Sequence, residues 1–150
     1  MKKVINIAVV GLGNVGAYLL NELNKKKKEI ENKTGRKINV EAISAKNINK
    51  KRKFKINKKI FYKNPLNIIN QKKIDILFEL IGQSDGISKK IVEKSLKSKI
   101  HVITANKSLI SKHGEYLALL AEKNKVNLEF EASVGGGIPI LRTIKDGLAT

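Results

Sequence analysis

The fold is decided by residues 4–16, which read VINIAVVGLGNVG. The run from Val4 to Val10 is almost wholly apolar and rich in β-branched side chains, a pattern typical of a strand that is covered on both faces. Gly11 ends this run, and from Asn14 onward apolar residues recur at helical spacing until Gly35 supplies a stop. We therefore predict a strand, a tight glycine turn and a long helix in direct succession.

The same alternation continues along the rest of the chain. Further strands are predicted at residues 38–45, 60–62, 74–81, 100–104 and 126–132, and further helices after Pro65, at 88–97, around 116–121 and from Pro139. Strands that alternate with helices imply right-handed crossovers. This order predicts an α/β fold of the Rossmann type, a doubly wound, mainly parallel sheet with helices on both faces and ligands at the carboxyl ends of the strands.

The chain is strongly basic, with a formal net charge of +18, but its basic residues are three Arg and otherwise Lys. A nucleic-acid-binding surface favours more Arg and aromatic residues than the three Tyr and four Phe present, so we expect no nucleic-acid partner. The basic runs at 25–28 and 50–59 are interpreted as solvated surface.

The absence of cysteine excludes disulfides and thiolate metal sites. Because the sequence has no apolar run of membrane-spanning length and no leader-like N-terminus, we expect a cytoplasmic protein without a membrane partner.

The turn after the first strand matches the fingerprint of dinucleotide-binding proteins, since it reads Gly11-Leu12-Gly13-Asn14-Val15-Gly16. Gly11 permits the tight turn, Gly13 lets the backbone approach a pyrophosphate, and Gly16 lets the helix pack closely on the strand. The N–H groups at the start of the helix would face the anion. A glycine turn used only for packing is the alternative. The buried strand before the turn and the amphipathic helix after it favour dinucleotide binding, and we expect these six residues to contact the cofactor.

The end of the second predicted strand indicates which dinucleotide is preferred. An acidic residue there would accept the ribose hydroxyls of NAD and repel the 2′-phosphate of NADP. The sequence instead reads Ser44-Ala45-Lys46-Asn47, and Glu41 lies too early in the strand to take that role. We predict cofactor contacts at Ala45, Lys46 and Arg52 and a preference for NADP(H) over NAD(H). The alternative is that a chain so rich in Lys places cations in this loop by chance.

A second candidate site follows the predicted strand that ends at Thr104. The sequence continues Ala105-Asn106-Lys107, and Lys107 would stand at the sheet edge where α/β folds place their chemistry. Hydride transfer to a carbonyl leaves an alkoxide, and an ammonium group beside that oxygen can polarise the carbonyl and donate a proton. Lys107 is therefore the candidate catalytic residue. A solvated lysine or a phosphate contact is the alternative.

Three consecutive glycines lie near the end of the chain. The segment reads Glu131-Ala132-Ser133-Val134-Gly135-Gly136-Gly137-Ile138-Pro139 and predicts an exposed turn between a strand and a helix. Backbone carbonyl oxygens in such a turn, together with the Glu131 carboxylate, would suit a hard cation. A tight crossover without a ligand fits the spacing equally well.

Taken together, these segments resemble the homoserine dehydrogenases. The resemblance rests on Gly11–Gly16, on Glu79–Gly82 together with His101–Lys107, and on Glu131–Pro139. It implies reduction of L-aspartate 4-semialdehyde to L-homoserine with NADPH or NADH, on the route to threonine and methionine.

The resemblance also implies roles for individual residues. Lys107 matches the catalytic lysine of the family. Ile81 and Gly82 match positions that line the dinucleotide, and we expect Thr104 and Lys107 beside it. The cation site of the family maps onto four positions that would hold sodium or potassium, namely the side chain of Glu131 and the backbone of Val134, Gly136 and Ile138.

A division of the chain follows from the same resemblance. Residues 1–135 would form the NAD(P)-binding domain, and residues 136–150 would begin a substrate domain that the family continues beyond residue 150. In the family that domain carries a second catalytic lysine and joins subunits into homo-oligomers, so we expect cofactor binding without full turnover of the small-molecule substrate. The alternatives are another oxidoreductase on the same scaffold and a non-enzymatic dinucleotide-sensing or nucleic-acid-binding module with a basic surface.

Overall fold

The computed structural model describes residues 4–48 and 56–134, which form a six-stranded sheet. The strands are β1 (Val4–Val10), β2 (Lys37–Ser44), β3 (Phe61–Tyr62), β4 (Ile76–Glu79), β5 (His101–Thr104) and β6 (Leu128–Glu129). Their order across the sheet is β3-β2-β1-β4-β5-β6, and every neighbouring pair is parallel. This is the strand order of the Rossmann fold, and the predicted fold class is confirmed.

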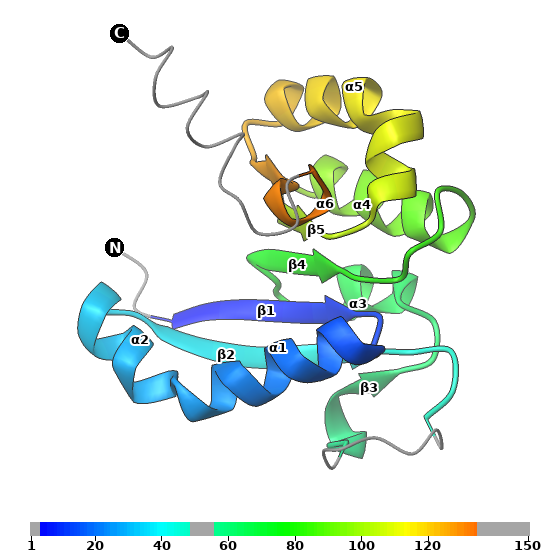
Figure 1. Ribbon diagram of the computed structural model, residues 1–150. Coiled ribbons are helices and arrows are strands. Elements are labelled where there is room, and N and C mark those ends of the chain that lie inside the picture. Colours follow the sequence, from blue (N-terminus) through cyan, green and yellow to red (C-terminus); the bar gives the residue numbers. More distant parts are fainter. Residues whose placement is uncertain (1–3, 49–55, 135–150) are drawn as a thin grey trace, which may run out of the picture.

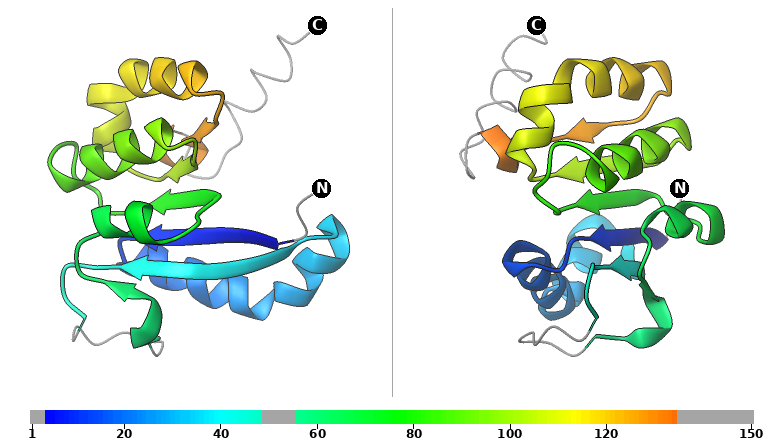
Figure 2. Two further views of the ribbon diagram at one scale, coloured as in Figure 1. Left: turned by 180° about the vertical axis from the view of Figure 1, so that it is seen from behind. Right: turned by 90° about the vertical axis from the view of Figure 1, so that its right-hand side faces the viewer.

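Helices connect the strands and cover both faces of the sheet. They are α1 (Asn14–Lys25), α2 (Lys27–Thr34), α3 (Leu66–Gln71), α4 (Ile87–Lys97), α5 (Lys107–Lys123) and α6 (Glu131–Val134), with a 3₁₀ turn, η1, at Lys58–Ile60. Figure 1 shows α1 in front of β1 and β2, and the view from behind in Figure 2 shows α3 and α4 on the opposite face. Among the described residues, no helix combines the length and the apolar character needed to cross a membrane.

The side chains of β1 contribute to both halves of the core because they alternate between the two faces of the sheet. Ile7 and Val9 belong to the apolar cluster that α1 covers. Ala8 and Val10 belong to the larger cluster on the other face, which α3, α4 and α5 cover. None of these four residues is more than 1% exposed. Burial on both faces explains why the strand needs an almost continuous apolar run.

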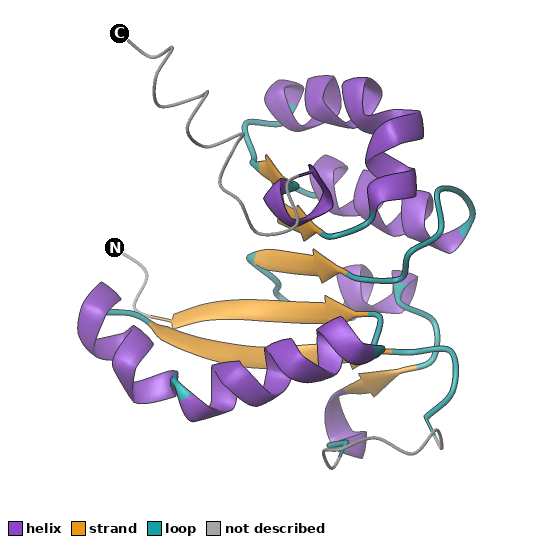
Figure 3. Ribbon diagram, in the orientation of Figure 1, coloured by secondary structure: helices purple, strands orange, loops and turns teal. Residues whose placement is uncertain are grey.

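The central place of β1 in the sheet also determines where the candidate site lies. β1 pairs with β2 on one side and with β4 on the other. The first connections lead outward from β1 to β3, and the later ones lead outward from β4 to β6. Figure 3 shows the strands and the helices that lie around them. The two sets of connections diverge between β1 and β4, which leaves a crevice at the carboxyl ends of these strands.

The long helix predicted after the glycine turn is divided into two helices. α1 ends at Lys25, and Lys26, with φ −93° and ψ 11°, separates it from α2. The predicted stop at Gly35 is confirmed, since Gly35 caps α2 in the left-handed conformation with φ 66°. The lysines at 25–28 are exposed, as the interpretation of this run as solvated surface requires.

The prediction of a strand over 126–132 is wrong after Glu129. β6 holds only Leu128 and Glu129, and α6 begins at Glu131. In the described part of the chain, β6 is an edge strand that pairs with β5 alone. A strand gains little from further extension when no partner is present for its backbone groups, and the chain turns into α6 instead.

Candidate functional site

The turn between β1 and α1 leaves no room for a side chain at two of its glycines. Gly11 has φ 103°, a conformation that L residues rarely adopt, and a Cβ atom there would lie 2.4 Å from the Leu80 carbonyl oxygen. A Cβ atom on Gly16 would lie 2.0 Å from the Gly11 carbonyl oxygen. The close packing of the turn on α1 and on the end of β4 therefore requires glycine at both positions.

Gly13 is different, because a Cβ atom there would meet nothing within 4 Å. Gly13 is the N-cap residue of α1, and no side chain of the described residues caps this helix. The first N–H groups of a helix have no partner within the helix. Gly13, Asn14 and Val15 are all exposed at this end. The helix start therefore offers backbone donors to an anion such as a pyrophosphate, and glycine at position 13 keeps the approach open.

A cleft of about 860 Å³ lies beside this turn, at the carboxyl ends of the strands. Its walls come from the glycine turn, the end of β2, the loop before α3 and the loop between β4 and α4. Its volume falls within the range of about 300–1,000 Å³ that is usual for small-molecule sites. The predicted cofactor residues that line it are Gly11, Leu12, Gly13, Ala45, Lys46 and Ile81.

Two lysines line the cleft on the side of β2 and β3. Lys46 is predicted there by the sequence, whereas Lys63 is not. Lys63 follows β3 directly, so the rule that ligands gather at the carboxyl ends of strands was the signal that could have identified it. None of the described residues that line the cleft is acidic. The cleft therefore presents two positive charges where an NAD-specific site places a carboxylate.

Glu41, the acidic residue of β2, is engaged away from the cleft. Its carboxylate accepts hydrogen bonds from Lys72 Nζ and Asn39 Nδ2, each at 2.9 Å. The Lys72 ammonium group lowers the pKa of Glu41 below its usual value, and the carboxylate in turn raises the pKa of Lys72. Glu41 does not belong to the lining of the cleft, in agreement with its early place in the strand.

A buried polar network joins the carboxyl ends of β4 and β5. At its centre is Glu79, the last residue of β4, which is 0% exposed. The Glu79 carboxylate accepts hydrogen bonds from Thr104 Oγ1 at 2.6 Å, from Ile81 N at 2.9 Å and from the Ser88 hydroxyl. Asn106 Nδ2 makes a longer contact with it at 3.4 Å. The sequence predictions do not include Glu79 as a site residue, although a charged residue inside an apolar strand was a usable signal.

Lys107 is the first residue of α5 and is exposed. Asn106 caps this helix, since its Oδ1 accepts a hydrogen bond from Leu109 N at 3.1 Å. Thr104 is fully buried, and its hydroxyl supports the turn before Lys107 by donating to Glu79. Neither Thr104 nor Lys107 lines the cleft. Gly82, with φ 90°, does not line it either but directly follows Ile81, which does. The cofactor contacts of these three residues stay predictions.

A surface ion cluster ties the loop between β4 and α4 to α5. Asp85 accepts a hydrogen bond from Lys112 Nζ at 2.8 Å, and its other oxygen lies 2.9 Å from His113 Nε2. These hydrogen bonds, that of Lys112 first, hold the pKa of Asp85 far below its usual value. Lys112 and His113 lie on the helix that begins with Lys107, so the cluster restrains that helix from outside.

The glycine turn and the cleft agree with a known family of domains. The family model described as the NAD binding domain of homoserine dehydrogenase matches residues 11–131. The chain belongs to the homoserine dehydrogenase family. The dinucleotide-binding domain predicted from the glycine turn is thereby confirmed at the level of the family, and the non-enzymatic alternative is not favoured.

Individual homoserine dehydrogenases match along almost the whole chain. That of Neisseria gonorrhoeae is 37% identical over 147 residues, which are 98% of this chain and 33% of that protein. The Bacillus subtilis enzyme is 32% identical over 148 residues, 99% of this chain and 34% of that protein. The crystal structure of S. aureus homoserine dehydrogenase at pH 7.5 superimposes with a TM-score of 0.83 at 35% identity and covers 89% of this chain and 34% of that one. The Thiobacillus denitrificans structure gives 0.84 at 32% identity, with 98% and 34% covered. The chain thus spans about a third of the length of the homoserine dehydrogenases it matches.

The predicted cation site of this homoserine dehydrogenase domain lies partly within the described residues. Glu131 begins α6 and Val134 ends it. Gly136 and Ile138, like the predicted cofactor residue Arg52, lie outside the described residues. Within the ranges 4–48 and 56–134, no group of three His, Cys, Asp or Glu residues is arranged to hold a metal ion. The cation stays a prediction.

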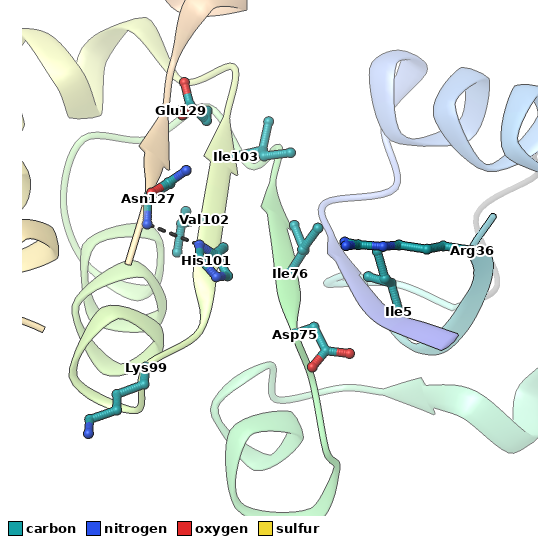
Figure 4. A pocket seen from close by; sticks show the side chains of 10 residues that line it. All are labelled: Ile5, Arg36, Asp75, Ile76, Lys99, His101, Val102, Ile103, Asn127 and Glu129. Carbon is teal, nitrogen blue, oxygen red and sulfur yellow. Dashed lines mark hydrogen bonds between the residues drawn. The ribbon is translucent and has the colours of Figure 1, made fainter. Parts of the chain in front are cut away.

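A second hollow, of about 420 Å³, is separate from the cleft beside the glycine turn of the homoserine dehydrogenase domain (Figure 4). Its lining includes Asp75, His101 and Asn127, which lie at the amino-terminal ends of β4, β5 and β6. His101 Nδ1 there accepts a hydrogen bond from Asn127 N at 3.0 Å. None of the predicted cofactor, catalytic or cation residues lines this hollow, so it adds nothing to the candidate site.

Proposed function

We propose that the chain is the cofactor-binding part of a homoserine dehydrogenase that prefers NADP(H) to NAD(H). In this proposal it takes part in the reduction of L-aspartate 4-semialdehyde to L-homoserine, on the route to threonine and methionine. The observation that supports the cofactor preference is the pair of lysines, Lys46 and Lys63, in a cleft whose described lining has no acidic residue. An ammonium group attracts the 2′-phosphate of NADP, and the missing carboxylate removes the ribose contact that NAD uses.

In this proposal, different residues of the domain bind different parts of the cofactor. The backbone from Gly11 to Gly16 binds the pyrophosphate, and Lys46 and Lys63 bind the 2′-phosphate. Ile81, Gly82 and the start of α5 lie at the carboxyl ends of β4 and β5, the half of a Rossmann sheet that receives the second nucleotide.

Lys107 acts on the substrate carbonyl in this proposal. When bound, the reduced nicotinamide supplies a hydride to the carbonyl carbon. The Lys107 ammonium group, at the first position of α5, stabilises the negative charge that develops on the carbonyl oxygen and donates a proton to it. Its exposure leaves it accessible to a substrate.

The remaining parts of the proposal concern the domain division, the cation and the oligomeric state, and they are based on the longer homoserine dehydrogenases that the chain matches. Residues 1–135 form the NAD(P)-binding domain, and residues 136–150 begin the substrate domain. Glu131 and the backbone of Val134, Gly136 and Ile138 hold sodium or potassium, and complete proteins form homo-oligomers. These assignments are supported by the family membership and by the share of each relative that the chain covers.

The cofactor preference is tested by fluorescence titration of the purified chain with NADPH and with NADH at moderate salt, which suppresses non-specific attraction to the lysine surface. Lys46→Ser and Lys63→Ser are expected to weaken NADPH binding by about tenfold each, the scale of one charge-assisted hydrogen bond, and to leave NADH binding nearly unchanged. Lys28→Ser is the matched control, because it removes the same charge from an exposed site on α2. Equal affinity of the unsubstituted chain for NADH and NADPH would contradict the proposal.

A further inference from the structure

The side chain of Glu79 is surrounded by hydrogen-bond donors. Thr104 Oγ1 accepts a hydrogen bond from Asn106 N, and Ser88 Oγ accepts one from Asn106 Nδ2, each at 3.0 Å. Each hydroxyl donates to Glu79 while it accepts from Asn106. Ile81 N, the third partner, can only donate. Both oxygens of Glu79 thus act as acceptors, whereas the amide nitrogen of a glutamine in its place could only donate.

Glu79 is the exception in the composition of its strand. β4 is an otherwise apolar strand, and its neighbour Leu77 is fully buried in the core. Among the described residues no basic side chain forms an ion pair with Glu79. A buried carboxylate without a cation is unfavourable for stability, and departures of this kind from a local rule concentrate at functional sites.

The network restrains two loops at the same edge of the sheet. In the loop between β4 and α4, it holds Ile81 through its N–H group and Gln83 through its carbonyl oxygen, which accepts from Asn106 Nδ2 at 2.7 Å. In the turn between β5 and α5, it holds Thr104 and Asn106, the residues that lead to Lys107. Ile81 and Gln83 also line the cofactor cleft.

The hydrogen bonds of the Glu79 network lie in one half of the dinucleotide site. β4 and β5 carry the second mononucleotide of a Rossmann fold, which is the nicotinamide half, whereas β1 and β2 carry the adenosine half. In the described part of the chain, no side-chain hydrogen bond joins the Glu79 network to Gly11–Gly16 or to Lys46. A change at Glu79 should therefore affect the two halves of the cofactor unequally.

We propose that Glu79 is a positioning residue for the nicotinamide half of the cofactor site. Its buried carboxylate fixes the Ile81–Gln83 loop relative to the start of α5, the two segments that would hold the nicotinamide. This inference rests on the proposed dinucleotide binding and deepens it, because it assigns a role to a side chain that does not itself line the cleft.

The test compares two ligands that share the adenosine half. The affinities of the chain for NADPH and for 2′,5′-ADP, which lacks the nicotinamide, are measured by calorimetry for the unsubstituted chain and for Glu79→Gln, which keeps the size of the side chain. A second pair of variants is Ser88→Ala and Ser95→Ala. Both serines are fully buried on α4, but Ser88 donates to Glu79, whereas Ser95 donates only to Ile91 O of its own helix.

Glu79→Gln is expected to weaken NADPH binding by about tenfold, the scale of one lost buried hydrogen bond, and to leave 2′,5′-ADP binding within about twofold. Ser88→Ala should act in the same direction and Ser95→Ala should not. Equal losses for both ligands, or unchanged NADPH binding, would overturn the inference while leaving dinucleotide binding intact. If Glu79→Gln does not fold, the two serine variants decide in the same way. Failure of the unsubstituted chain to bind either ligand would overturn the proposed function and the inference with it.

Discussion

The three glycines of the first turn are required for different physical reasons. Gly11 and Gly16 satisfy the packing of the protein on itself, because a Cβ atom at either position would overlap a backbone carbonyl group. Gly13 satisfies the approach of a ligand, because a Cβ atom there would meet no protein atom. The same residue type therefore supports stability at two positions and binding at the third.

This difference predicts opposite outcomes for two substitutions in the same turn. Gly16→Ala should lower the free energy of unfolding by about 1–3 kcal/mol through overpacking against the Gly11 carbonyl group. Gly13→Val should lower it by less than about 1 kcal/mol, since the φ of −75° suits an L residue and only the helix cap is altered. Gly13→Val should nevertheless abolish saturable NADPH binding. Thermal unfolding and fluorescence titration measure the two effects, and a Gly13→Val protein as unstable as Gly16→Ala would refute the distinction.

At the scale of elements, the sequence predicts the bounds of a strand or helix best where residues within that element determine them. The apolar run of β1 and the stop at Gly35 could be read locally, and both are confirmed. The length of β6 could not, because it depends on how far the neighbouring strand offers a partner. The Glu79 network could not be predicted from spacing either, because Ser88 and Thr104 come from segments that only the folded sheet brings together. Lys63 could have been identified, because it directly follows the strand predicted at residues 60–62.

The end of α2 offers a test of a local element signal. Gly35 has φ 66°, and a Cβ atom there would meet nothing within 4 Å, so any penalty for a side chain is conformational and not steric. Gly35→Ala is expected to destabilise the chain by about 1 kcal/mol. Gly35→Asn is the control and should cost less, because Asn tolerates the left-handed conformation better. Chemical denaturation measures both, and a neutral Gly35→Ala would show that the cap contributes nothing to α2.

At the scale of the whole molecule, acidic residues are scarce, and some of them join separate elements. The chain has 13 Asp and Glu residues against 31 Lys and Arg residues, so each carboxylate offsets repulsion within a strongly positive protein. The pair of Glu41 and Lys72 joins β2 to the end of α3, and Asp85 joins the loop after β4 to α5. Protonation of these carboxylates raises the net charge and removes the links in one step.

The Glu41 pair predicts how stability depends on pH. The pKa of Glu41 is lower in the folded chain than the usual value of 4.5 for a free Glu side chain, chiefly because of the hydrogen bond from Lys72. Its contribution to stability is therefore present above about pH 4.5 and is lost as the pH falls through the folded pKa. Glu41→Gln should lower the melting temperature by about 2 °C at pH 7, a small effect because the pair is partly exposed. The difference from the unsubstituted chain should shrink below about pH 4.5 and vanish once both carry a neutral side chain. Glu115→Gln, an exposed site on α5 that changes the net charge equally, is the control and should show a smaller difference at pH 7. A Glu41→Gln difference that grows on acidification would contradict the lowered pKa.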